Sequence, residues 1–151
     1  MPQSLAKVIL HTVFSTKGRA AYLTPQPIRA ELYSYLATVL KALDSPAVII
    51  GGIADHVHIL HLLSRTRSIA EVVEEIKTAS SKWIKIKGEQ YRDFHWQGGY
   101  GVFSVSESKL PDVRAYIENQ EEHHRKMSFQ DEFRELCRRH GVGMDEKYVW
   151  D

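Results

Sequence analysis

The feature that most constrains the fold is the order in which two hydrophobic periodicities alternate along the 151 residues. Apolar residues at every second position indicate strands, and apolar residues three and four apart indicate helices. In chain order these patterns predict strand, helix, strand, strand, helix, strand, followed by further helices. The predicted strands span 5–14, 47–54, 56–63 and 100–105, and the helical patterns span 28–43, 69–83, 110–117 and 128–140.

Local signals support these boundaries. Thr24 followed by Pro25 predicts a helix start, with a capping side chain and then a first-turn proline. Ser68, with Glu71 three residues later, has the spacing of a capping box at the next helix. The two middle strands are separated only by a tight connection near Asp55, which predicts a hairpin.

This order predicts an α+β fold of the ferredoxin-like β-α-β-β-α-β type, with additional C-terminal helices. We expect one domain over residues 1–151, because the length suits a single domain and 43% of residues are hydrophobic. Two helices should cover one face of a four-stranded antiparallel sheet and leave the opposite face free for a ligand or partner. The first and third strands should be central.

Composition excludes several kinds of site. Cys137 is the only cysteine, so neither an intrachain disulfide nor a cysteine-rich zinc site is possible, and we expect Cys137 to pack as a small hydrophobe. The net charge of +1 does not by itself indicate a nucleic-acid partner. The first residues lack a secretory signal, and no apolar run approaches the roughly 18 residues of a membrane span. The glycine-rich segment 98–101 lacks the ending of a phosphate loop, so no nucleotide cofactor is expected.

Two histidines form the first candidate site. His56 and His58 lie two residues apart on the predicted third strand, so their imidazoles project from the same face and could bind one divalent cation. Two polar residues on a solvated sheet face would give the same pattern, and spacing alone favours that simpler interpretation.

The second candidate pair is Tyr116 and Gln120, four residues apart on the third predicted helix and therefore on one helical face. A tyrosine can attack phosphorus when a cation polarises the phosphate, and an amide oxygen is a suitable ligand for Mg²⁺ or Mn²⁺. A partly exposed tyrosine beside an ordinary surface glutamine is the simpler alternative.

Three motifs together resemble a known family. The segments Asp55-His56-Val57-His58-Ile59-Leu60, Gly99-Tyr100-Gly101 and Tyr116-Ile117-Glu118-Asn119-Gln120 resemble, in order and spacing, the single-tyrosine HUH transposases of the insertion-sequence 200/605 type. This family includes the REP-associated tyrosine transposases. The similarity runs from about Ala6 to Lys126, and His123-His124-Arg125-Lys126 resembles one subgroup.

The resemblance implies a site and a reaction. His56, His58 and Gln120 would hold Mg²⁺ or Mn²⁺, and Tyr116 would attack the scissile phosphate to leave a 5′-phosphotyrosine and a free 3′-hydroxyl. The substrate would be single-stranded DNA with a hairpin at transposon ends. The protein would be a homodimer in which the tyrosine helix of one subunit can complete the other subunit's site. It would work in the cytoplasm of a bacterial or archaeal cell, on the nucleoid when bound to DNA.

Basic residues near aromatic rings are candidates for DNA contacts. Trp83 and Tyr91 lie within a basic stretch, where lysine and arginine side chains next to stackable rings suit single-stranded DNA. A solvated helix end with Trp83 in the core is equally compatible. The candidate contacts are Lys77, Lys82, Lys85, Lys87, Arg92 and Arg19.

The sequence leaves the roles of several histidines and glutamates near the candidate site open. We expect His123 and His124 to be solvated, although they could be spare ligands, and any one of Glu118, Glu121 and Glu122 could replace Gln120 at the metal.

Two other functions fit the same fold. One is a domesticated protein that binds or nicks REP-like hairpins, and the other is a non-catalytic module that binds RNA or DNA on an open sheet face.

Overall fold

The structure, a computed structural model, describes residues 2–151 and contains one antiparallel four-stranded sheet. The strands are β1 (Ile9–Ser15), β2 (Ala47–Ile53), β3 (His56–Leu62) and β4 (Gly101–Val105). Their order is β2-β3-β1-β4, which confirms the predicted central positions of the first and third strands. The hairpin between β2 and β3 is also confirmed. The α+β architecture predicted from the sequence is therefore correct.

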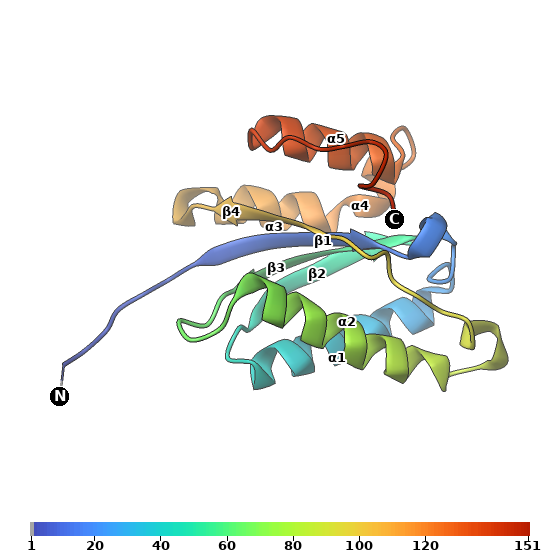
Figure 1. The fold of residues 1–151 in the computed structure, drawn as a ribbon, viewed down its shortest axis with the longest axis horizontal. Helices are drawn as coiled ribbons and strands as arrows, with labels where there is room; N and C mark the ends of the chain where they lie inside the picture. The colour runs from blue at the N-terminus through green and yellow to red at the C-terminus, as the bar shows by residue number, and fades with distance from the viewer. Residues whose placement is uncertain (1) are drawn as a thin grey trace.

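Two long helices, α1 (Gln26–Ala42) and α2 (Ile69–Lys85), cover one face of the sheet (Figure 1). They bury the main core, which includes Leu32, Leu36 and Ile76. Ser68 caps α2 as predicted, because its hydroxyl accepts from the Glu71 backbone amide at 3.1 Å. The predicted cap of α1 is wrong. The Thr24 hydroxyl instead donates to the Ala21 carbonyl, and α1 begins one residue after Pro25.

The opposite face of the sheet is covered, contrary to the prediction that it would be free. Three helices lie across it in Figure 1: α3 (Leu110–Glu118), α4 (Gln120–His123) and α5 (Phe129–Arg139). α5 is strongly amphipathic, and its apolar stripe would be exposed to water if this face were open. Phe129, Phe133, Leu136 and Cys137 instead pack against Val13 and Phe103 of the sheet. Cys137 is buried, as expected.

Two glycines permit this close packing. A Cβ atom on Gly51 of β2 would lie 2.5 Å from the carbonyl oxygen of Ile117 in α3. A Cβ atom on Gly101 of β4 would lie 2.8 Å from the Phe133 ring of α5. Gly101, the last residue of the Gly99-Tyr100-Gly101 motif, is thus partly a packing requirement for α5.

Short segments complete the fold. The 3-10 helices η1 (Lys17–Arg19), η2 (Glu89–Tyr91) and η3 (Glu107–Lys109) connect the main elements. Across residues 2–151, no helix has both the length and the apolar composition needed to cross a membrane.

Candidate active site

The two histidines of β3 form the floor of the site. His56 and His58 are fully buried and point toward the face covered by α3 and α5, so the solvated-face alternative is wrong. A neighbour contacts Nδ1 of each ring: Asp55 Oδ1 lies 2.7 Å from that of His56, and His11 Nε2 lies 2.7 Å from that of His58. The Nε2 atoms of both rings therefore face one shared position where a ligand could bind. Histidines that bind metals are oriented in the same way, by a partner on the other ring nitrogen.

Gln120 and Tyr116 reach the same point from the helices. The helix ends at Glu118, and α4 restarts at Gln120 after Asn119 adopts φ −101° and ψ 25°. The side-chain oxygen of Gln120 lies 3.1 Å from His56 Nε2. The Tyr116 ring lies edge-on to His58, with 5.8 Å between ring centroids. All four residues predicted from the motifs converge within one chain, although Tyr116 and Gln120 lie on two helical segments rather than one.

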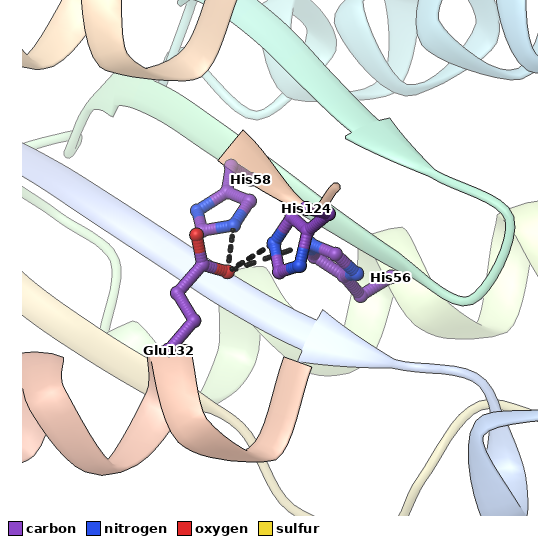
Figure 2. Close-up of side chains that lie close together, drawn as sticks. All are labelled: His56, His58, His124 and Glu132. Atoms are coloured by element: carbon purple, nitrogen blue, oxygen red, sulfur yellow. Dashed lines mark hydrogen bonds and ion pairs between the residues drawn. The ribbon is translucent and has the colours of Figure 1, made fainter. Parts of the chain in front are cut away.

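The structure adds Glu132 of α5, which no sequence motif indicates. The Glu132 Oε1 atom lies 2.8 Å from His58 Nε2, 3.0 Å from His124 Nε2 and 3.4 Å from His56 Nε2 (Figure 2). Its Oε2 atom accepts hydrogen bonds from the Gln120 amide at 3.2 Å and from the Tyr116 hydroxyl. In the sequence Glu132 is one of two acidic residues in the first turn of a capped helix, a position that ordinary helix electrostatics explains. Only the docking of α5 distinguishes it.

The side chain of His124 is buried, so the expectation that it would be solvated is wrong. Its side chain is 2% exposed, and its Nε2 makes no hydrogen bond within residues 2–151. His123 is partly exposed and lies 3.2 Å from Glu132 Oε2.

The three glutamates considered as substitutes for Gln120 do not enter the site. Each pairs with an arginine outside it, and the pairs are Glu118 with Arg114, Glu121 with Arg29, and Glu122 with Arg125.

The electrostatics of the cluster separate its two β3 histidines. Burial lowers the pKa of His56, but its contacts with Asp55 and Glu132 outweigh this and raise the pKa to about 9. Burial lowers the pKa of His58 to about 4. Burial and the nearby Glu132 carboxylate raise the pKa of the Tyr116 phenol well above its usual range. The phenol is therefore protonated in this arrangement, and forming a phenolate would require added positive charge.

The cluster has the chemistry of a metal site. The ligand atoms of His56, His58, His124 and Glu132 all lie within 4.8 Å of one another. Imidazole and carboxylate groups are common ligands of divalent cations, and an unpartnered buried Nε2 is unfavourable unless something fills its lone pair. The residues present therefore fit a divalent cation.

Lys77 is occupied by protein groups. α2 lies on the sheet face opposite the site, and the Lys77 ammonium donates to the carbonyls of Gln97 at 2.8 Å and Gly99 at 2.6 Å. Burial lowers its pKa to about 8. Its position is that of a structural cation that holds the loop before β4.

The other candidate DNA contacts differ in their surroundings. Lys82 and Lys85 line a shallow hollow beside Gly98. The Lys87 ammonium lies over the Trp83 ring, 4.7 Å from its centroid. Two arginines have protein partners: Arg92 pairs with Glu89 at 2.8 Å, and Arg19 donates to the Trp150 carbonyl at 2.8 Å.

Comparison with known proteins agrees with this fold. A candidate transposase of Deinococcus radiodurans superposes with a TM-score of 0.62 at 24% identity, over 80% of this chain and 95% of its own. A REP-associated tyrosine transposase bound to a REP hairpin gives a TM-score of 0.52 at 13% identity, over 78% of this chain and 67% of its own. Comparison with curated proteins gave no significant match. The sequence pattern of the family described as "Transposase IS200 like" matches residues 4–120, and this chain therefore belongs to the IS200-like transposase family.

Proposed function

We propose that this transposase cuts and rejoins single-stranded DNA at transposon ends through a covalent bond between Tyr116 and a 5′ phosphate. The observation that carries the proposal is the convergence of the Tyr116 phenol, the Gln120 amide and the two Nε2 atoms of β3 around one buried point. A nucleophile beside a cluster of metal-ligating groups is the arrangement that phosphoryl transfer requires.

His56, His58 and Gln120 would hold a divalent cation, Mg²⁺ or Mn²⁺, which when bound supplies positive charge to the phosphate oxygens. Asp55 and His11 keep the two rings oriented through their Nδ1 atoms. Gln120 is itself oriented, because its amide group also donates to the Tyr116 carbonyl at 3.4 Å. The same contact ties the metal ligand to the helix that carries the nucleophile.

Tyr116 performs the covalent step. Its phenol oxygen attacks the phosphorus and loses its proton, the bond from phosphorus to the 3′ oxygen breaks, and that oxygen leaves as a 3′-hydroxyl after taking a proton. The new phosphodiester between Tyr116 and the 5′ end conserves the energy of the broken bond. A 3′-hydroxyl can therefore reverse the attack and rejoin strands without a nucleotide cofactor.

The substrate we propose is single-stranded DNA carrying a hairpin. Support comes from the fold shared with a transposase bound to a REP hairpin and from the basic side chains of α2. Lys82, Lys85 and Lys87 are the stronger candidates for phosphate contacts, because Lys77, Arg92 and Arg19 already pair with oxygen atoms of the protein.

The homodimer stays a prediction. One chain brings Tyr116 to its own histidines, which supports a site completed within the subunit, and light scattering would measure the assembly state. A domesticated nuclease that acts on REP-like hairpins would use the same site. The RNA-binding alternative loses support, because α3 and α5 cover the face it requires.

Mass spectrometry of the covalent adduct tests the proposal. Purified protein with Mn²⁺ or Mg²⁺ and a hairpin oligonucleotide from its own genomic flanks should form an adduct mapped to Tyr116. Tyr116→Phe should abolish it. Tyr148→Phe, at an exposed position near the C-terminus, should not. An adduct that persists in Tyr116→Phe would refute the assignment of the nucleophile.

A further inference from the structure

The segment that follows Gln120 brings two metal-ligating side chains into the site. The family pattern ends at residue 120, so His124 and the whole of α5 lie beyond the matched region. His124 and Glu132 nevertheless belong to the four-residue cluster shown in Figure 2. The matched pattern therefore includes neither residue, although His124 lies in the segment His123-His124-Arg125-Lys126 that resembles one subgroup of the family.

We propose that Glu132 and His124 bind the same cation as His56 and His58 in the resting protein, and that Glu132 must leave the cation before a DNA phosphate can bind there. The second part of this proposal, the displacement of Glu132 by DNA, rests on the function proposed above. Its metal-binding part stands on the cluster alone.

The arrangement of His124 supports shared ligation. Its Nε2 lies at ion-pair distance, 3.0 Å, from Glu132 Oε1, and it has no hydrogen-bond partner within residues 2–151. Two ligand atoms that each lie about 2.1 Å from one cation are about 3 Å apart. Their lone pairs then point to the cation and not to each other. A carboxylate among imidazoles is also a common donor set of transition metals.

Packing, rather than a mobile tail, places Glu132. Phe133 and Leu136 of α5 are buried against the sheet, and Trp150 packs on α5 from the C-terminal side. The Glu132 side chain is 2% exposed. Its location therefore follows from the docking of α5 and is part of the resting fold.

Glu132 occupies positions that a substrate would need. Its Oε1 lies among the histidine Nε2 atoms and its Oε2 accepts from the Tyr116 hydroxyl, so one carboxylate contacts both the ligand cluster and the nucleophile. A phosphate approaching the phenol with an oxygen on the cation would have to displace it. A carboxylate and a phosphate carry charge of the same sign, so the two exclude each other electrostatically as well as sterically.

Titration with Co²⁺ as a spectroscopic probe tests the ligation. We expect wild-type protein to bind Co²⁺ with visible absorption bands, and Glu132→Ala and His124→Ala each to weaken Co²⁺ binding at least tenfold and alter the bands. Glu135→Gln, on the outer side of α5, should match wild type. Melting curves and Glu132→Gln, which keeps the shape of the side chain, guard against a folding defect. Unchanged Co²⁺ affinity and bands in folded Glu132→Ala and His124→Ala would overturn the ligation.

Cleavage at saturating Mn²⁺ tests the displacement. With metal occupancy verified, Glu132→Ala should bind single-stranded DNA more tightly and cleave it several-fold faster than wild type. Equal or slower cleavage would overturn the displacement. If no variant or wild-type protein forms a DNA adduct while the Co²⁺ bands still depend on Glu132, the proposed function fails and the ligation stands.

Discussion

Phe133→Ala should release α5 from the sheet while leaving the four strands folded. Phe133 packs between Phe129, with 5.6 Å between ring centroids, and Trp150 at 5.9 Å, directly over Gly101. Removing a buried phenylalanine side chain costs about 3–5 kcal/mol. Because α5 contacts the sheet mainly through this cluster, most of that loss should fall on the local opening of α5.

Hydrogen exchange followed by mass spectrometry measures this loss. A decrease of about 3 kcal/mol in the free energy of local opening corresponds to roughly a hundredfold faster exchange, since about 1.4 kcal/mol is a factor of ten. Peptides from α5 should show that acceleration, and peptides from β1 and β3 should change little. Ile86→Ala, at a side chain that is 84% exposed, serves as the control. Equal acceleration in α5 and the central strands would refute the view that α5 opens independently.

Three other perturbations follow from the same contacts. Asp55→Asn removes the carboxylate that orients His56, and it should weaken Co²⁺ binding about 10–100-fold without lowering secondary structure by circular dichroism; unchanged affinity would contradict that role. Burial lowers the pKa values of His11 and His58, the latter to about 4. In the metal-free protein these two neutral, buried rings should therefore contribute their full share to the free energy of unfolding above about pH 6.5. As the pH falls from 6.5 toward 4, the unfolded chain takes up protons that the folded chain does not, and up to about 1.4 kcal/mol per pH unit per group should be lost; thermal melting that is flat between pH 6.5 and 5 would contradict this. Replacing Lys82 and Lys85 together by alanine should weaken single-stranded DNA binding and reduce the slope of log affinity against log salt by about 0.7 per lost phosphate contact, whereas an unchanged slope would place the DNA elsewhere.

Much of the fold was predictable because its signals are local. The alternation in β3 and the Ser68 cap depend on residues that are neighbours in the sequence. The convergence of His56 with Gln120 was predictable only through the family motifs, because the two residues are 64 positions apart and no periodicity connects them.

The missed parts depend on packing between distant segments. Glu132 and His124 look like solvated residues of short helices, and they become site residues only when α5 docks on the second face of the sheet. The partners of Lys77 were unpredictable for the same reason, because the carbonyls that hold its ammonium lie in a loop about twenty residues further along. The covered face itself could have been suspected from the apolar stripe of α5, which needs a partner surface.

The order of the site along the chain also sets an order during translation. The two β3 histidines, with their partners His11 and Asp55, are made in the first 58 residues, whereas Tyr116 and Glu132 come in the final third. At about 5–20 residues per second, the ribosome adds Tyr116, the proposed nucleophile, several seconds after the strand that carries the proposed metal ligands. A nascent chain thus has the strand that carries its histidines well before it has the proposed nucleophile, and Tyr116 is followed within 16 residues by the carboxylate that contacts it.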